Sequence, residues 1–502
     1  MFKKSLAVFL SFIMMMSFAQ IAFASLDDVD YEIANPYKNV DWSTYGQYKT
    51  DLHCHTTFSD GSNPLPEMVE RHYELGFDAM TITDHGTVNR SLLSQEFNTP
   101  MTLFSLIKNG GLYNDVLSEN GIAANGNPYT VTVRDGDEFY NQNNGKMMLH
   151  IPFGNEQNPT SFNNAHVNSF FVDYGDGLVG GTSNYLSPIK NVHERGGLTI
   201  INHPGEYTNA RDELYTEDAY NREDAVYNYK IQRFINLLKE YDSCLGIDIN
   251  SKGDSRTRFD RKLWDILLQE VVPSGRNVFA VATTDAHNLK VVDSGYTVML
   301  MPTLSSKNIR TAMEEGSFFA ASKYVGNLDE LVGYYNTLSA SDNAEAKEFS
   351  EVIKTYIDSI ELELSEGEQD TRFFTNDTSV PAPKVTDITV DDEEDTITIT
   401  TENALLVHWI ADGKVIATGN TIDLDDYSDE IGSYVRAEFF GKGGIMYSQA
   451  FTLRYDGAPE EKADGEFVDF GLVVSAICDT VVKALVVAFE VPLAVIRKIL
   501  TK

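Results

Sequence analysis

The 502-residue chain is too long for a single hydrophobic core, so we expect two or three domains. Its formal net charge of -36 argues against a surface that binds nucleic acid or anionic lipid without specificity, although a locally basic site is compatible with it. The three cysteines, Cys54, Cys244 and Cys478, are odd in number and far apart, so the sequence does not indicate a disulfide framework.

Residues 1–24 have the pattern of a secretory signal peptide. Lys3 and Lys4 precede an apolar stretch that ends near residue 18, and Ala22-Phe23-Ala24 supplies small residues for cleavage. The alternative is an N-terminal membrane anchor, which the short apolar run and the acidic residues that follow it disfavour. We therefore expect an exported protein, cleaved after Ala24 and either secreted or held at a surface.

From about residue 40 to 325, strand-like runs alternate with helix-like ones. The strand-like runs are residues 48–52, 79–83, 198–201, 245–249 and 278–282, and the helix-like runs are 64–75, 188–195, 228–241 and 259–270. This alternation predicts a parallel sheet covered by helices. Residues 89–186 do not follow this alternation of strands and helices and contain many Asn and Gly residues. We therefore expect long loops there that cover a site.

Four of these strand-like runs end in residues that bind metals. The segments are His53-x-His55, Asp84-His85, Asn202-His203 and Asp285-x-His287, which hold five of the ten histidines. Residues two apart on a strand point to the same side, and the carboxyl ends of parallel strands meet at one edge. Cys54 points to the opposite side and is expected to be buried. The sequence therefore predicts one cluster of imidazoles and carboxylates.

Such a cluster can bind more than one divalent ion. Two ions about 3.5–4 Å apart can bridge a hydroxide and stabilise both oxygens of an in-line displacement, and they bring the pKa of bound water toward about 7. Mixed imidazole and carboxylate donors without paired cysteines suit zinc, manganese or iron. A purely structural metal site is the alternative, and the convergence of many donors at an open strand end disfavours it.

These motifs resemble the PHP superfamily, named for polymerase and histidinol phosphatase. The resemblance runs from about residue 48 to 322 and rests on His53-x-His55-Thr-x-x-Ser-Asp60-Gly61, the three later motifs in the same order, and a closing segment at 312–320. It implies a distorted (β/α)7 barrel that holds two or three divalent ions and hydrolyses phosphoesters.

The resemblance also implies the ligands. Matched position by position, they are His53, His55, Asp60, His85, His203, Asp285 and His287. A bridging Glu and one more His complete the pattern. We expect them at Glu138 and His150, with Asp137 as a rival to Glu138, because the family has an acidic residue at the end of its third strand and a His on the next strand.

Other polar residues near these motifs have several interpretations. Asp84 could orient a metal-bound water, accept a proton or hold His85, and we favour the last. His166 falls in the loop-rich region, where it could lie near the mouth of the site. His72 and His193 are expected to be ordinary core or surface residues, and His408 to be structural.

A local group of cations follows the strand at 245–249. Lys252, Arg256 or Arg258 could bind the phosphate of a substrate, because this segment starts at the carboxyl end of a strand. The alternative, which we favour, is a solvated helix start in which these cations pair with Asp254, Asp260 and Asp265.

The sequence from residue 326 to 502 predicts three further segments. Residues 326–380 form a helical, acidic connector, and residues 381–456 contain short alternating strands of a small all-β sandwich that resembles immunoglobulin or fibronectin type III modules around Trp409. Residues 457–502 form an apolar, amphipathic helical tail too interrupted by charge to span a membrane. The tail could bind a membrane surface, self-associate or pack on the chain itself.

The function expected from these features is a secreted metal-dependent hydrolase of a small phosphorylated molecule or nucleotide. An exonuclease for nucleic acid ends is disfavoured by the charge and by the lack of a basic patch with interleaved aromatics. A non-catalytic exported binding protein and an amidohydrolase-type barrel are further alternatives. The complete ligand set disfavours the first, and Ser59-Asp60-Gly61 disfavours the second. The sequence does not identify a binding partner for the β module of residues 381–456.

Overall fold

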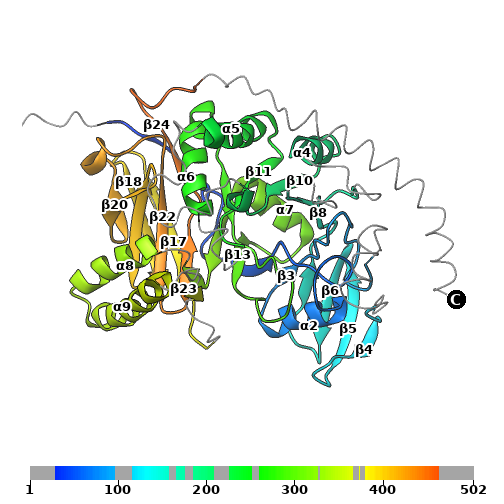
Figure 1. Cartoon of the computed structure of the whole chain (residues 1–502). Helices are drawn as coiled ribbons and strands as arrows, with labels where there is room; N and C mark the ends of the chain where they lie inside the picture. Colours follow the sequence, from blue (N-terminus) through cyan, green and yellow to red (C-terminus); the bar gives the residue numbers. More distant parts are fainter. Residues whose placement is uncertain are drawn as a thin grey trace, which may run out of the picture.

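The computed structural model describes residues 29–95, 116–157, 165–175, 185–207, 225–251, 259–325, 328–365, 372–373 and 379–462. The predicted signal peptide, the cations Lys252, Arg256 and Arg258, and the apolar tail from residue 463 onward lie outside these residues. Within them the chain is a mixed α/β structure (Figure 1).

One sheet carries the later motifs of the predicted site. Its strands are β8 (Asn155–Glu156), β9 (Val167–Phe170), β10 (Leu198–Ile201), β11 (Cys244–Asp248) and β12 (Phe279–Val281), in the order β12-β11-β10-β9-β8. Strands β10, β11 and β12 run parallel, as predicted. Strand β9 runs antiparallel to β10 and to β8, so its amino end lies at the same edge as the carboxyl ends of its neighbours.

A second, larger sheet carries the first motifs. Strands β2 (Gly46–Asp51), β3 (Ala79–Met80) and β7 (Met148–His150) are parallel neighbours in it. An antiparallel arm of β6 (Asp137–Gln142), β5 (Pro128–Arg134) and β4 (Asn120–Ile122) continues from β7. On the other side β2 pairs with β13 (Gly295–Met301), which pairs with β14 (Phe318–Ser322).

Isolated backbone bridges connect the two sheets near the predicted ligands. Cys54 pairs with Ala286, and His85 pairs with Glu156, both in parallel orientation. These bridges bring the ends of β2 and β12 together, and those of β3 and β8. The closed (β/α)7 barrel remains a prediction.

Helices cover these sheets near the predicted positions. They are α2 (Leu65–Glu74), α4 (Leu186–His193), α5 (Ala225–Glu240), α6 (Asp260–Val271) and α7 (Ser306–Glu315), with 3-10 turns η1 (Pro204–Tyr207) and η3 (Val272–Ser274). Helix α2 buries Leu65, Met68 and Val69, which lie on one face because a helix has 3.6 residues per turn. Pro66 lies in the first turn of the helix, where the fixed φ of proline is favourable and its missing N–H is not needed.

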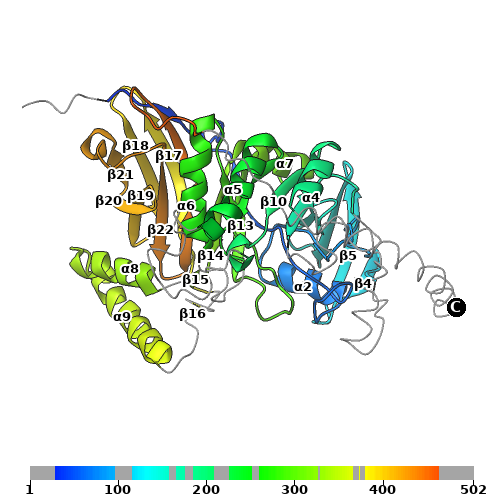
Figure 2. The same ribbon diagram turned by 45° about the horizontal axis from the view of Figure 1, so that its top comes forward.

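The C-terminal part begins with two helices and continues with strands, as the sequence predicted. Helices α8 (Leu328–Ala340) and α9 (Ala344–Ser365) form a pair beside the C-terminal strands, away from β4 and β5 (Figure 2). The short strands β15 (Tyr324–Val325) and β16 (Arg372–Phe373) pair with each other. A sheet of β17 (Lys384–Asp391), β18 (Thr396–Glu402) and β21 (Thr421–Asp423) follows, and the turn η4 (Asp425–Tyr427) comes after β21.

The remaining C-terminal strands are not a separate sheet. They are β19 (Leu406–Ala411), β20 (Lys414–Thr418), β22 (Tyr434–Gly441), β23 (Gly444–Tyr447) and β24 (Phe451–Arg454). Strand β23 pairs with β14, and β24 pairs with the N-terminal strand β1 (Glu32–Ala34). The larger sheet therefore runs through both predicted domains, with 14 strands among the described residues. The immunoglobulin-like identity of the C-terminal strands remains a prediction.

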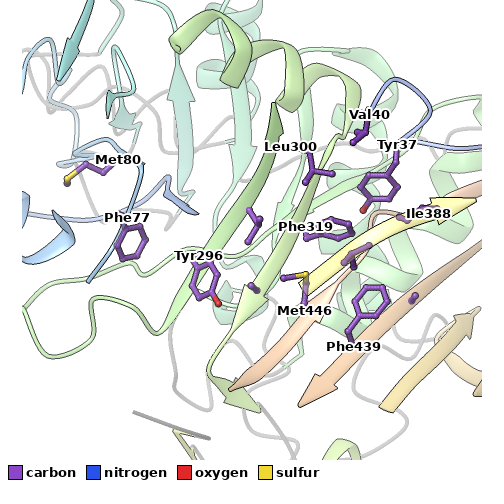
Figure 3. Packing of buried hydrophobic residues seen from close by; sticks show 14 of the residues in the cluster. Tyr37, Val40, Phe77, Met80, Tyr296, Leu300, Phe319, Ile388, Phe439 and Met446 are labelled. Carbon is purple, nitrogen blue, oxygen red and sulfur yellow. The ribbon is translucent and has the colours of Figure 1, made fainter. Parts of the chain in front are cut away.

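Buried apolar side chains fill the junction between these two parts. Phe319 of β14 stacks on Tyr37 with ring centroids 4.8 Å apart and lies edge-on to Phe439 of β22 at 6.3 Å (Figure 3). Met446 and Ile388 come from the C-terminal strands to the same cluster. Continuous packing of this kind explains why the boundary near residue 381 does not separate two cores.

A buried polar cluster also joins the two parts, and we call it the interface cluster. It consists of Arg261 and Asp265 on α6, Glu330 on α8, and Arg436 and Glu438 on β22. Two guanidinium nitrogens of Arg436 lie 2.8 Å from the two oxygens of Asp265, and a third lies 2.7 Å from Glu438. Arg261 donates to both oxygens of Glu330 at 2.6 Å. These charges border a cavity of about 210 Å³.

Within the described ranges, no helix combines the length and apolar character needed to span a membrane.

Candidate metal centre

The strand ends bring most of the predicted ligands together. His53 and His55 follow β2, His85 follows β3, His203 follows β10, and Asp285 and His287 follow β12. With Asp60, and with Glu156 and His166, these residues form overlapping groups whose donor atoms lie within 4.8 Å of one another. We call these nine residues the site cluster.

One oxygen of Glu156 lies at the centre of the deepest part of the cluster. Its Oε2 is 2.9 Å from Nδ1 of His85, 3.3 Å from Nε2 of His55 and 3.5 Å from Nε2 of His53. The other oxygen, Oε1, is 2.7 Å from Nδ1 of His166 and 3.7 Å from Nε2 of His203. Glu156 therefore occupies the position expected of a bridging carboxylate.

Asp285 and Asp60 bring carboxylates from two other sides. Oδ1 of Asp285 is 3.1 Å from Nε2 of His55 and 3.4 Å from Nε2 of His53, and Oδ2 is 3.6 Å from Nε2 of His203. Asp60 lies nearer the solvent, 3.1 Å from Nε2 of His287, 3.5 Å from Nδ1 of His55 and 3.6 Å from Nε2 of His85.

The donor set fits divalent cations. Among the described residues, Oε2 of Glu156 has no hydrogen bond of acceptable geometry, although three imidazole nitrogens lie within 3.5 Å of it. Buried acceptors in proteins are almost always satisfied, and nitrogens and oxygens that approach without hydrogen-bond geometry are typical of ligands aimed at a shared ion. The residues that could hold such ions are His53, His55, Asp60, His85, Glu156, His166, His203, Asp285 and His287.

The electrostatics of the metal-free cluster are those of paired imidazoles and carboxylates. Burial alone would lower the pKa of His85, but the Glu156 and Asp60 carboxylates raise it to about 10. Burial has the same effect on His55, and the Asp285 and Glu156 carboxylates raise its pKa well above the usual value. Burial alone would raise the pKa of Glu156, but His166, His85 and His53 hold it well below its ordinary range. Divalent cations would take the place of these protons.

Two residues of the site cluster have strained backbone. His203 has a φ of 26° and Asp285 has a φ of 41°, a region that residues with a Cβ rarely adopt. Hydrogen bonds from buried side chains hold both segments. The Asp260 carboxylate accepts the Gly205 N–H at 2.5 Å, and the Thr284 hydroxyl donates to Asp51 at 2.6 Å and accepts the Ala286 N–H.

Asp84 does not reach the site cluster. Its carboxylate accepts hydrogen bonds from the Thr56 N–H at 2.8 Å, the Thr56 hydroxyl at 2.6 Å, the Ser59 hydroxyl at 2.5 Å and the Gln95 amide at 3.3 Å. Asp84 therefore fixes the loop that follows His55 rather than holding His85. This corrects its predicted role.

Glu138 and His150 lie away from the site cluster, which corrects both assignments. The Glu138 carboxylate accepts hydrogen bonds from the Ser91 hydroxyl and the Leu92 N–H. His150 is buried with Nε2 2.7 Å from Oδ1 of Asn89, and burial lowers its pKa to about 3. The rival Asp137 accepts from the Ser306 N–H at the start of α7. Glu156 and His166 take the two positions instead.

The other histidines have structural surroundings. His72 is buried between the Met68 carbonyl at 2.7 Å and the Asp51 carboxylate at 2.8 Å. His193 lies near Ser243 and Asp242, and His408 lies 3.1 Å from the Thr337 hydroxyl. Cys54 is buried, as expected.

Comparison with known proteins supports the family resemblance for one segment. Residues 51–174 match the PHP domain family. This segment includes Glu156 and His166, whereas His203, Asp285 and His287 lie beyond it. No curated protein matches the chain.

Three solved structures resemble the chain weakly. A two-domain protein from Bacteroides vulgatus that contains a predicted PHP-like metal-dependent phosphoesterase shares 14% identity with a TM-score of 0.34, over 82% of this chain and 88% of its own. PsfC from Pseudomonas syringae shares 12% with a TM-score of 0.32, over 62% and 99%. The lesion-specific endonuclease EndoQ from Pyrococcus furiosus shares 12% with a TM-score of 0.27, over 54% and 56%. TM-scores this low do not establish a shared overall fold.

Proposed function

We propose that this chain is a metal-dependent hydrolase of phosphoesters that acts on a phosphomonoester or a small phosphodiester. The observation that carries the proposal is Oε2 of Glu156, a buried carboxylate oxygen with three imidazole nitrogens within 3.5 Å and no hydrogen bond of acceptable geometry among the described residues. In this proposal the nine residues of the site cluster hold two or three divalent ions, of zinc, manganese or iron. When bound, such ions polarise the phosphoryl oxygens and make a hydroxide available near neutral pH.

The chain's own residues divide into a deep and an outer group. The side chains of His53, His55, Glu156, His203 and Asp285 are at most 1% exposed, so they hold the ions away from bulk water. The side chains of His85, His166, Asp60 and His287 are between 12% and 30% exposed. A substrate would approach past this outer group, where His287 and Asp60 lie 3.1 Å apart.

The finer parts of the proposal rest on sequence alone. Export rests on the signal-like residues 1–24, and a small substrate rests on the net charge of -36, which disfavours a long polyanion. A role for Lys252, Arg256 or Arg258 in phosphate binding stays a prediction, as do the surface association of the tail and a partner for the β module.

Hydrolysis of p-nitrophenyl phosphate and its bis diester tests the proposal. We expect turnover that chelator removes and that added zinc or manganese restores, and loss of turnover in Asp285→Asn. Glu138→Gln is the matched control, since this carboxylate lies outside the site cluster. Absence of turnover on both esters and on a nucleotide panel, with metal bound at full occupancy, would contradict hydrolysis and favour an exported binding protein.

A further inference from the structure

Two buried asparagines link Glu156 to the strands that carry His53 and His203. Nδ2 of Asn202 lies 3.0 Å from Oε1 of Glu156 and 2.8 Å from Oδ1 of Asn168. Nδ2 of Asn168 lies 3.0 Å from the carbonyl oxygen of Leu52. We call this chain of hydrogen bonds the amide relay. Asn168 and Asn202 are at most 1% exposed, so water does not compete with these bonds.

The relay has one consistent orientation. The Leu52 carbonyl can only accept, so Asn168 must turn its amide nitrogen toward it and its oxygen toward Asn202. Asn202 then faces two acceptors and must donate both of its N–H bonds, one to Asn168 and one to Glu156. Either amide in the flipped orientation would place two oxygens against each other. The sheet therefore fixes which way Asn202 faces.

The amide relay donates a hydrogen bond to only one oxygen of Glu156. The other oxygen faces the centre of the site cluster. Oε1 faces N–H donors, namely the Asn202 amide at 3.0 Å and the His166 ring at 2.7 Å. Oε2 instead faces the imidazoles of His53, His55 and His85 without a hydrogen bond of acceptable geometry. A neutral donor at Oε1 can fix the plane of the carboxylate without offsetting its charge.

The position of Asn168 in the sheet explains how two amides reach three ligand-bearing segments. Asn168 of β9 pairs with Glu156 of β8 on one side and with Ile200 of β10 on the other. Asn202 directly precedes His203, and Leu52 directly precedes His53. The relay thus ties β8, β10 and the end of β2 through β9, which lies between β8 and β10.

We propose that Asn202, held by Asn168, is a positioning residue that orients Glu156 so that its Oε2 faces the bound ions. This proposal rests on the proposed metal centre but not on the reaction that the centre catalyses. Partners that orient a metal ligand typically contribute about 10–100-fold to metal affinity or activity. Asn202→Ala should therefore weaken Mn²⁺ binding by about that factor, and Asn202→Asp by at least as much, because a second carboxylate would repel Glu156.

Mn²⁺ titration followed by the electron paramagnetic resonance signal of the free ion tests the relay without any substrate. Wild type, Asn202→Ala, Asn202→Asp and Asn168→Ala are compared, with Asn308→Asp as the matched control. Asn308 lies in the first turn of α7 and its side chain donates to Thr303 at the surface. The hydrogen bonds described for it do not involve the site cluster. We expect a smaller loss for Asn168→Ala than for Asn202→Ala, since the bond to Glu156 keeps its donor. Circular dichroism shows whether each variant is folded.

The outcomes separate the two proposals. Mn²⁺ affinities of folded Asn202 variants within about twofold of wild type would overturn the relay and leave the proposed function standing. Weakened binding in the Asn202 variants without phosphoester turnover by wild type would support the relay and contradict the hydrolase. If neither Asn202 variant folds, Asn168→Ala decides through the same titration. A wild-type protein that binds no Mn²⁺, Zn²⁺ or Fe²⁺ would overturn both.

Discussion

The site cluster and the interface cluster are both largely buried groups of ionisable side chains, yet their hydrogen bonding differs. In the interface cluster the Arg436 and Arg261 guanidinium groups donate to Asp265, Glu438 and Glu330 at 2.6–2.8 Å. In the site cluster several carboxylate and imidazole atoms face one another without hydrogen-bond geometry, as Oε2 of Glu156 does. Buried charges that have hydrogen-bonded partners of opposite sign need no further ligand, whereas the converging carboxylates and imidazoles of the site cluster fit a divalent cation.

The difference separates a structural role from a chemical one. The interface cluster ties α6 and α8 to β22, so it joins the two parts of the chain, and each of its carboxylates accepts a hydrogen bond from a guanidinium group. The site cluster lies where strands end and backbone is strained at His203 and Asp285, which is typical of functional sites. Changes in the first should alter folding stability, and changes in the second should alter metal binding.

The largest expected effect on stability is that of Arg436→Met. The change leaves Asp265 and Glu438 buried without their cation, and breaking a buried ion pair on one side costs about 3–5 kcal/mol. Urea unfolding followed by Trp fluorescence measures it, because Trp264 and Trp409 are buried in the folded chain and reach water on unfolding.

Arg310→Met is the matched control for that change. Arg310 pairs with Glu314 on the exposed face of α7, and exposed pairs four residues apart contribute about 0.3–0.5 kcal/mol. Equal losses of unfolding free energy in Arg436→Met and Arg310→Met would contradict the distinction between a buried network and a surface pair.

The next effect is that of Glu156→Gln on metal binding. The amide keeps the shape of the side chain but loses the charge that His53, His55 and His85 surround, so we expect metal affinity to fall more than about 100-fold, beyond the loss typical of an orienting partner. Competition with a chromophoric chelator measures it. Wild-type affinity in this variant would show that another carboxylate bridges the ions.

The pH dependence of metal binding gives a smaller effect. The raised pKa values of His55 and His85, about 10 for the latter, mean that these rings are protonated near neutral pH in the metal-free protein. Each proton displaced by a metal makes the apparent affinity rise up to about tenfold per pH unit between pH 6 and 8. Calorimetry in buffers of different ionisation enthalpy counts the released protons. Affinity that is constant over this range would contradict the assignment of both rings as ligands.

The smallest effect expected at the site is that of Glu138→Gln. This carboxylate accepts from Ser91 and Leu92 and has no contact with the site cluster, so metal affinity should change by less than about twofold. A lost hydrogen bond there should cost about 1 kcal/mol of stability. The chelator competition used for Glu156→Gln measures the first effect. A loss of metal as large as in Glu156→Gln would return Glu138 to the ligand set.

The sequence predicted that the side chains at the ends of regular parallel strands come together in the site cluster. A strand-like segment precedes His53, and apolar or β-branched runs precede His85, His203 and Asp285. In the structure these segments contain β2, β3, β10 and β12. Periodicity and strand-end position were therefore sufficient for these residues, because both are local properties of the chain.

Glu156 and His166 could not be found by the same rule. Glu156 lies on a two-residue strand within the polar segment Asn155-Glu156-Gln157, which has no apolar run. His166 precedes β9 rather than following it, and it reaches the site edge because β9 runs antiparallel to β10. The arm of β4, β5 and β6 separates His85 from Glu156 in the chain but not in space, so the nearest strand-end candidates in the sequence, Glu138 and His150, were the wrong ones.

The C-terminal strands also show that local sequence patterns predict strands but not how distant strands pair. Their positions were predicted from alternation and turns, but the pairing of β23 with β14 joins segments more than 100 residues apart. Register between distant strands depends on packing such as that of Phe319 with Phe439, which no local pattern encodes.

Anomalous scattering from crystals grown with Mn²⁺ or Zn²⁺ tests the metal centre most directly. We predict peaks between Oε2 of Glu156, the carboxylate of Asp285 and the imidazoles of His53, His55 and His85. A map without peaks among these side chains, from protein saturated with the same metal, would contradict the assignment of this cluster as a metal centre.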